Sequence, residues 1–343
     1  MKPLKTAAVF LLSVIVLFPA FSQDAGSQGK EGSNDEPDFF LVTVLETAFS
    51  GELRWRPDWP ADIPPDGFSL QKGDRPRTLE LSNETASYAV KRDSGGRLVE
   101  FPFFFEDSYA KVGAAYSEAG AIKTMVVSIK NYASESDDKS AQAEEKTMNI
   151  EFPDGFLPYS DLSPGGSFPP IKVTSDDSIY YVFIFESPAF LTETWYDGNG
   201  EMLAFCKASV NTHNGAWRIR SLQIYSEAGV KFEDRFFDSF GNISEIRIED
   251  RIFTSHFTGA DRPVFWNCRD YQYEMRWDAV GFLRSMKAKG GSDDAEIEYR
   301  YEYELDPRGN WIKRIEAAYA LKFDLIVPQP SLSRGIWNRR IED

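Results

Sequence analysis

Histidine-dependent chemistry has few candidate residues in this chain. The sequence holds two histidines, His213 and His256. A catalytic triad needs a Ser or Cys nucleophile and a carboxylate beside its histidine, and nothing in the sequence pairs either residue with such partners. His213 stands in the turn-like stretch 211–215, and His256 stands in a strand or loop, so we interpret both as non-catalytic.

Residues for carboxylate-based catalysis are abundant, because the chain contains 54 Asp and Glu residues. Glycoside hydrolysis needs only two carboxylates at a fixed separation, and aromatic side chains, 15% of the chain, could line a sugar cleft. Strand packing accounts for most of these aromatics. The exceptions to test are Trp55, Trp59, Trp217 and Trp266, for which packing is still the favoured interpretation. We therefore predict no enzyme and no catalytic residue.

Metal and cofactor binding are equally unsupported. A calcium loop needs acidic or carbonyl ligands at several alternating positions, and only the stretch Asp197–Glu201 approaches that density. An Asp that caps its own turn explains this stretch better. Zinc-ligand spacing and phosphate-binding glycine loops are absent from the sequence. We predict no metal site and no cofactor.

The two cysteines, Cys206 and Cys268, each lie in a strand-like stretch. In an oxidising compartment a lone pair in one domain can form a disulfide, and a bridge between neighbouring strands is feasible. Two buried free thiols are an equally weighted alternative.

A repeated turn pattern indicates the elements that would position any site. Four times an apolar residue precedes Asp-x-x-Gly, a pattern in which Asp accepts hydrogen bonds from backbone N–H groups and Gly takes a positive φ. Weaker versions occur at Asp93–Gly96, and with Ser in place of Asp at 116–120 and 225–229. The four clear turns are anchored by Asp197 and Gly200, Asp238 and Gly241, Asp278 and Gly281, and Asp306 and Gly309.

Strict alternation of apolar and charged residues surrounds these turns. It is clearest over ten residues in 296–305, where one face is apolar and the other charged, the pattern of a half-buried strand. One-sided burial favours antiparallel pairing. The runs 179–185 and 101–105 are apolar on both sides and are interpreted as strands covered on both faces, with Pro102 placing the second run at an edge. We predict an all-β fold, an antiparallel meander forming a curved sheet or two packed sheets, with few or no long helices.

The N-terminus predicts export. Residues 1–22 have a basic start, an apolar run of roughly a dozen residues and small residues before the expected cleavage point, as in a secretory signal peptide. Residues 23–38 predict a flexible linker, 39–190 an N-terminal β region and 191–343 a repeat region, with one continuous β domain 39–343 as the alternative. No later apolar run is long enough to span a membrane as a helix. The formal charge of −16 argues against nucleic acid as a partner.

The aromatic-Asp-x-x-Gly units in 191–343 resemble YD repeats, the tandem strand–turn–strand motif of Rhs-type bacterial secreted and surface proteins. The segments 196–201 and 303–311 carry the resemblance best, and the second resembles the final unit of short YD-repeat proteins. The resemblance implies a secreted or envelope β protein of bacteria without an assigned reaction. Only one unit has a literal Tyr-Asp, so the large hollow shells of longer arrays are not implied.

These observations predict a non-enzymatic exported protein, periplasmic or extracellular, that acts as an interaction module for an unknown protein or envelope component. A sheet face, the loops or an exposed sheet edge would bind the partner. The alternatives are a carrier of a lipid or other apolar ligand, which predicts a large apolar concavity, and a carbohydrate-active enzyme, which predicts two facing carboxylates in an aromatic cleft.

Overall fold

The computed structural model describes one helix and 21 strands, all within the unit 37–343. The described residues are 40–53, 55, 63–68, 76–105, 108–131, 145–156, 169–175, 178–186, 190–213, 216–248, 251–258, 262–268, 271–290, 296–322, 325–330 and 335–342. The predicted signal peptide and linker, 1–38, lie outside these residues.

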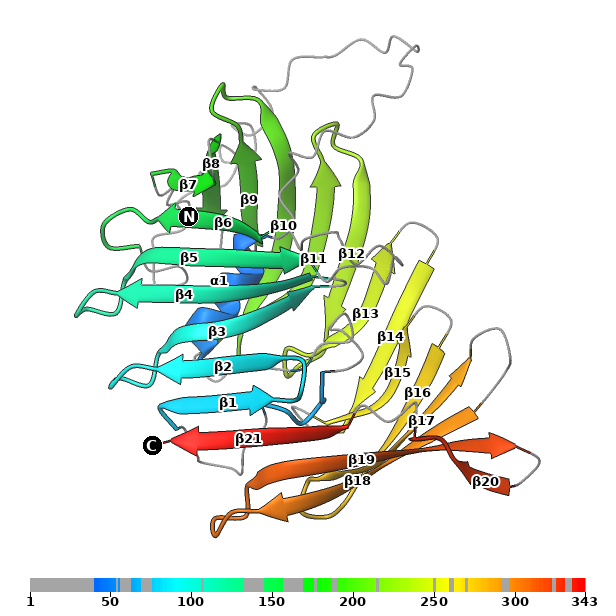
Figure 1. The fold of residues 1–343 in the computed structure, drawn as a ribbon. Helices are drawn as coiled ribbons and strands as arrows, with labels where there is room; N and C mark the ends of the chain where they lie inside the picture. The colour runs from blue at the N-terminus through cyan, green and yellow to red at the C-terminus, as the bar shows by residue number, and fades with distance from the viewer. Residues whose placement is uncertain are drawn as a thin grey trace, which may run out of the picture. The chain divides into compact units, whose positions relative to one another are not determined.

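Figure 1 labels the elements along the chain. The first half contains α1 (Leu41–Ser50), β1 (Thr78–Ser82), β2 (Ser87–Arg92), β3 (Leu98–Phe105), β4 (Ser108–Tyr116), β5 (Ile122–Asn131), β6 (Glu145–Glu151), β7 (Ile171–Ser175), β8 (Ser178–Glu186), β9 (Phe190–Tyr196) and β10 (Met202–His213). The second half contains β11 (Ala216–Ser226), β12 (Lys231–Phe237), β13 (Ile243–Ile248), β14 (Arg251–Phe257), β15 (Pro263–Cys268), β16 (Tyr271–Trp277), β17 (Leu283–Gly290), β18 (Glu296–Leu305), β19 (Trp311–Lys322), β20 (Leu325–Pro328) and β21 (Ile336–Glu342).

The strands form a single antiparallel sheet that closes on itself. From β1 to β19 each strand pairs with the next along the chain, and β21 then pairs with β19 on one side and with β1 on the other. In the described part of the chain, β20 pairs only with β19 and lies outside the ring. The prediction of an all-β antiparallel meander with few helices is confirmed. Its last strand meets its first, which makes the sheet a β-barrel.

The Asp-x-x-Gly pattern sets the hairpins. At every such turn the first residue's N–H donates to the carbonyl four residues on, and the glycine N–H donates back to the first residue's carbonyl. Each glycine has a positive φ, such as 85° at Gly309, and the strand register shifts beside it. This is a tight turn followed by a glycine bulge. Among the described residues it recurs at Asp93, Ser117, Asp197, Ser226, Asp238, Asp278 and Asp306.

Alternation along the strands separates the inside of the barrel from the outside. On β18, Tyr299 and Tyr301 are buried, whereas Arg300, Glu302 and Glu304 are exposed. The inward positions form two apolar clusters, one mainly from β1–β11 with α1, the other mainly from β15–β19 with β21. The core therefore lies within the closed sheet.

Helix α1 and the turn 63–67 lie inside the barrel with this core. Leu41, Val42, Val44, Leu45 and Ala48 of α1 are all buried. The helix contacts β3 on one side and β11 on another, so it lies between walls that are far apart in strand order (Figure 1). Sequence analysis had placed these residues in a β region; apolar residues at positions 41, 44, 45 and 48 are the helical spacing that it missed.

Candidate functional site

The outer face of strands β8–β11 carries a group of outward aromatic side chains, two of them exposed and three half-buried. We call Tyr181 and Phe183 of β8, Tyr196 of β9, Phe205 of β10 and Tyr225 of β11 the outer aromatic face. Tyr181 is 37% exposed and Phe183 is 44% exposed. Their strand neighbours Val182 and Ile184 point inward and are buried, so the aromatic rings stand on the solvent side.

Strand register arranges these rings in two groups. Tyr181 lies opposite Tyr196, and Phe183 meets Tyr196 edge-on with ring centroids 5.4 Å apart. Phe205 and Tyr225 stack face to face with centroids 4.4 Å apart. Thr194 of β9 is paired with both Phe183 and Phe205, so one threonine separates the groups. The two groups are thus two strand spacings apart, about 10 Å.

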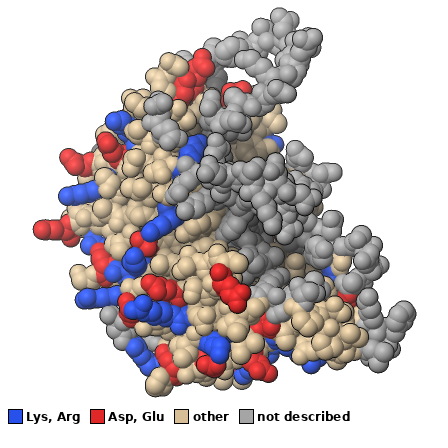
Figure 2. All heavy atoms as spheres, in the orientation of Figure 1, with Lys and Arg blue, Asp and Glu red and all other residues tan. Residues whose placement is uncertain are grey.

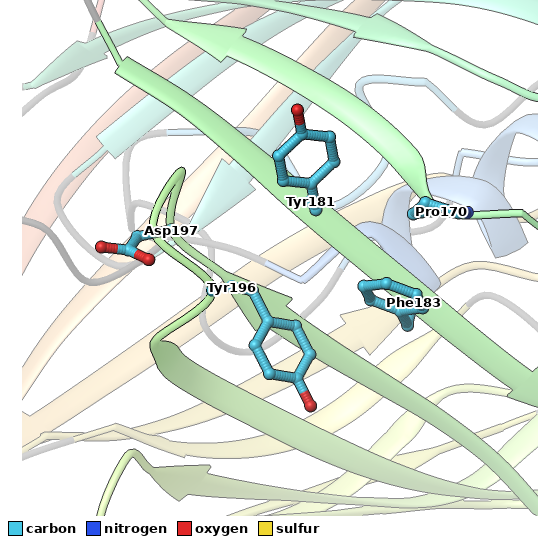
Figure 3. A pocket seen from close by; sticks show the side chains of 6 residues that line it. Pro170, Tyr181, Phe183, Tyr196 and Asp197 are labelled. Atoms are coloured by element: carbon cyan, nitrogen blue, oxygen red, sulfur yellow. The ribbon is translucent and has the colours of Figure 1, made fainter.

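A shallow hollow opens beside the first group (Figure 3). Its volume is about 330 Å³, and its lining is almost entirely apolar. This volume is at the lower end of the range of small-molecule sites, roughly 300–1,000 Å³. The lining residues are Pro170, Tyr181, Phe183, Tyr196, Asp197 and Gly200.

Few charged groups interrupt this face. The ammonium of Lys207 lies 4.5 Å from the centre of the Phe190 ring. Asp197 accepts hydrogen bonds from the N–H groups of Asn199 and Glu201 within its own turn, and the bond from Glu201 lowers its pKa. Thr194 supplies an uncharged hydroxyl between Phe183 and Phe205, and Thr192 lies two residues away on the same side of β9.

Charged side chains are frequent on other parts of the outer surface. On the face seen in Figure 2, side chains of both signs are interspersed over β1–β5 and β18–β21. Ion pairs join outward residues of neighbouring strands, for example Lys313 with Glu304 at 2.7 Å and Lys287 with Glu296 at 2.7 Å. The outer aromatic face therefore differs in chemistry from these strands.

Two polar sites lie inside the barrel and hold the internal segment. Glu193 of β9 is fully buried and accepts hydrogen bonds from the N–H groups of Leu41 and Val42, each at 2.7 Å, and from Trp195 Nε1 at 2.6 Å. These bonds satisfy the free N–H groups at the start of α1. Burial raises the pKa of Glu193 to about 7, although the three hydrogen bonds lower it.

The second internal site holds the turn 63–67. The buried Asp66 carboxylate accepts hydrogen bonds from Arg314 Nη1 at 3.0 Å and from the Tyr303 hydroxyl at 2.9 Å. Burial raises the pKa of Tyr303. Arg314 also lies over the Tyr301 ring, at 4.6 Å. Between these sites Arg218 of β11 pairs with Glu52 at 3.4 Å, so three wall residues hold the segment that precedes β1.

The residues singled out in the sequence have structural positions. Asp197, Asp238, Asp278 and Asp306 each accept hydrogen bonds from N–H groups of their own turns, and Gly200, Gly241, Gly281 and Gly309 have positive φ. Because these turns lie at the ends of different hairpins, their carboxylates do not converge on one centre. In the described part of the chain, no group of three or more His, Cys, Asp or Glu could hold a metal ion.

The cysteines lie on strands that are not neighbours. Cys206 of β10 is a free, buried thiol opposite Glu193, and burial, then the nearby carboxylate, raises its pKa. Cys268 lies on β15, which pairs with β14 and β16, so the neighbouring-strand arrangement that would favour a bridge is not present.

The histidines and tryptophans do not form a site with these groups. His213 is the last residue of β10 and pairs with Ala216, which corrects its assignment to a turn; His256 is exposed on β14. Trp55 and Trp266 are buried against each other with ring centroids 5.2 Å apart. Trp217 is on β11, and Trp59 lies outside the described residues.

Sequence reasoning missed the outer aromatic face although its signal was present. The run 179–185 was interpreted as a strand covered on both faces, and this is wrong: Ile179, Tyr181 and Phe183 are exposed. A strand with apolar residues on both faces has the same sequence pattern whether its outer face is covered by another layer or open to solvent. Glu193, Asp66 and Arg314 gave no signal, because a charged residue at an inward position looks like an irregularity in the alternation.

Comparisons with known proteins add little to this geometry. No protein-family model matches the chain, and no curated protein matches it. Among solved structures, a porin-like protein from Bacteroides uniformis ATCC 8492 is similar, at 11% sequence identity and a TM-score of 0.36. The match covers 80% of this chain and 100% of the other. Similarity at this level assigns no function. Among the described residues, no helix is long and apolar enough to cross a membrane.

Proposed function

We propose that this chain is an exported, non-enzymatic binding protein of the bacterial envelope, and that the outer aromatic face is its binding surface. The observation that carries the proposal is the exposure of the neighbouring outward rings of Tyr181 and Phe183 on β8, beside an apolar hollow that both of them line. Exposed aromatic groups on a protein surface mark interaction sites, because leaving them in water costs free energy that a partner recovers.

The inside of the barrel supports a binding role over a carrier role. A carrier would need an apolar concavity, but the inward positions of the described strands belong to two clusters of buried side chains. Helix α1 and the turn 63–67 occupy the interior with them. The binding surface in this proposal is therefore outside the barrel.

The charged outer surface supports contact with water. Strands that face lipid carry apolar residues outward, with polar residues toward the lumen. Here the order is reversed on β18, where Arg300, Glu302 and Glu304 point outward and Tyr299 and Tyr301 point inward. Export rests on the predicted signal peptide, 1–22. A relationship to YD-repeat proteins is part of the proposal, supported by the seven described turns that share one hydrogen-bond pattern.

Binding to envelope material from the bacterial host tests the proposal. A variant with Tyr181→Ser, Phe183→Ser and Tyr196→Ser would be compared with the wild type in a sedimentation assay with isolated envelopes. The control carries Phe240→Ser and Ile252→Ser, which remove exposed apolar groups elsewhere. We expect at least about tenfold weaker binding by the first variant alone, the equivalent of about 1.4 kcal/mol. Equal binding by all three proteins, with unchanged thermal melting, would refute the proposal.

A further inference from the structure

The chemistry of the outer aromatic face specifies the kind of ligand, if the proposed function holds. The face combines three features: open aromatic rings, uncharged hydroxyls between them and few charges. Each feature limits the class of partner, and together they select one.

Tyr181 and Phe183 present apolar ring surface to solvent, and the half-buried rings of Tyr196, Phe205 and Tyr225 extend the apolar surface beside them. Phe183 and Tyr196 form one group, and Phe205 with Tyr225 forms the other, about 10 Å away across two strand spacings. The face of an aromatic ring carries partial negative charge and attracts the weakly positive C–H groups of another molecule. A pyranose ring has such a C–H face, and a chain of sugars would place several along one row of the sheet.

Hydroxyl groups lie where a sugar's own hydroxyls would need partners. Tyr181 and Tyr196 are opposite one another on β8 and β9, and Thr192 and Thr194 share the outward side of β9. Hydroxyls both donate and accept hydrogen bonds, so they match the mixed donors and acceptors of a sugar.

Charge disfavours polyanionic ligands at this face. The nearby charged groups are few: the Lys207 ammonium lies over the Phe190 ring, and both side-chain oxygens of Asp197 accept hydrogen bonds within its turn. The whole chain has a formal charge of −16, which repels polyanions over long range. An uncharged ligand is not repelled by this net charge.

The size of the face argues against a protein partner. A stable protein interface needs roughly 20–30 residues on each side. The aromatic face itself comprises Tyr181, Phe183, Tyr196, Phe205 and Tyr225, and charge returns at once on β12 with Lys231 and Asp234, 2.6 Å apart. The hollow of about 330 Å³ is also of small-ligand size. We infer that the outer aromatic face binds an uncharged polysaccharide.

Affinity electrophoresis of the purified mature protein in gels containing soluble polysaccharides tests this inference. The neutral probes are glucan, mannan and galactan, and the charged probe is alginate. The variants are Tyr181→Ala and Phe183→Ala, with Phe240→Ala as the exposed aromatic control from a different hairpin. We expect at least one neutral probe to retard the wild type and Phe240→Ala equally. Each face variant should bind that probe roughly tenfold more weakly, because losing one buried ring costs about 1.5 kcal/mol or more.

Each alternative result decides a separate point. If no neutral probe retards the protein while the serine variant still loses envelope binding, the glycan inference is wrong and the proposed function stands with a protein partner. If retardation occurs but is the same in every variant, the ligand binds elsewhere and the inference is also wrong. Retardation by alginate alone, abolished by salt, would identify an ionic site and contradict it. If the serine variant keeps full envelope binding, the proposed function itself fails.

Discussion

Replacing Glu193 with Gln should remove a specific pH dependence of stability. Glu193 is fully buried and accepts three hydrogen bonds, two from the first N–H groups of α1 and one from Trp195. The Gln side chain has nearly the same size but one acceptor oxygen, and its NH₂ group would face N–H donors. The variant therefore tests the carboxyl group with little change in packing volume.

The size and sign of the effect follow from the pKa. Burial raises the pKa of Glu193 from its ordinary 4.5 to about 7 in the folded protein. Because the folded state then holds its proton to higher pH than the unfolded chain, the free energy of unfolding falls as pH rises from 4.5 to 7. Each pH unit is worth about 1.4 kcal/mol, so the loss is about 3 kcal/mol. Above pH 7 this contribution is constant.

Urea unfolding followed by tryptophan fluorescence measures the effect at about pH 4.5, 6 and 8. Other carboxyl groups also titrate, so the quantity of interest is the difference between wild type and Glu193→Gln at each pH. The turn aspartates Asp197, Asp278 and Asp306 have lowered pKa values and titrate below this window. We expect the wild type to be more stable at pH 4.5 by about 1–3 kcal/mol, since the Gln oxygen can keep the bonds from Leu41 and Trp195 but the Val42 N–H then faces the NH₂ group. This difference should shift by about 3 kcal/mol in favour of the variant at pH 8.

A parallel pH profile for the two proteins would show that Glu193 does not titrate in this range in the folded state. A variant as stable as the wild type at every pH would show that its hydrogen bonds to α1 contribute nothing. The first result would refute the raised pKa of Glu193, and the second would refute its assignment as the residue that holds the internal helix.

Two further predictions concern the other internal site and the turns. Arg314→Met should destabilise the fold by about 3–5 kcal/mol, because it leaves the buried Asp66 carboxylate without its ion pair, and adding Asp66→Asn should recover part of the loss in denaturant unfolding. No recovery in the double variant would contradict the pairing. Gly309→Ala should cost about 1 kcal/mol from backbone strain alone, since φ is 85° and no atom lies within 4 Å of an added Cβ. Gly113→Ala on β4, which has ordinary backbone, is the control, and equal melting temperatures for the two would contradict the turn geometry.

The repeating strand–turn–strand unit could be predicted because its causes are local. Alternation in 296–305 reports which side of a strand is buried, and Asp306 and Gly309 report a reversal. Pro102 was predicted to lie at an edge, but β3 pairs with β2 on one side and with β4 on the other. The described pairing with β2 ends at Glu100, so the missing N–H of Pro102 interrupts no described β2 pair.

Closure of the sheet and the outer aromatic face could not be predicted, because both depend on distant partners. Nothing near 336–342 indicates that this strand pairs with 78–82. The exposure of Phe183 depends on whether another layer of structure covers β8. The sequence of β8 alone does not indicate whether such a layer exists. Glu193 lies at an inward position of β9, and only its partners on α1, distant in sequence, explain why a carboxyl group is accommodated there; Arg314 does the same for Asp66.

The pairing of β1 with β21 makes closure of the sheet depend on contacts between distant parts of the chain. The strand that closes the ring follows the other described strands along the sequence, while α1, which it helps to enclose, precedes them. Contacts so distant in sequence form slowly. A product that stops before Ile336 keeps unpaired backbone on β1 and β19, the kind of edge that recruits other strands. Both edges are covered only while β21 is paired, so the loss of this one strand would expose the sheet on two sides.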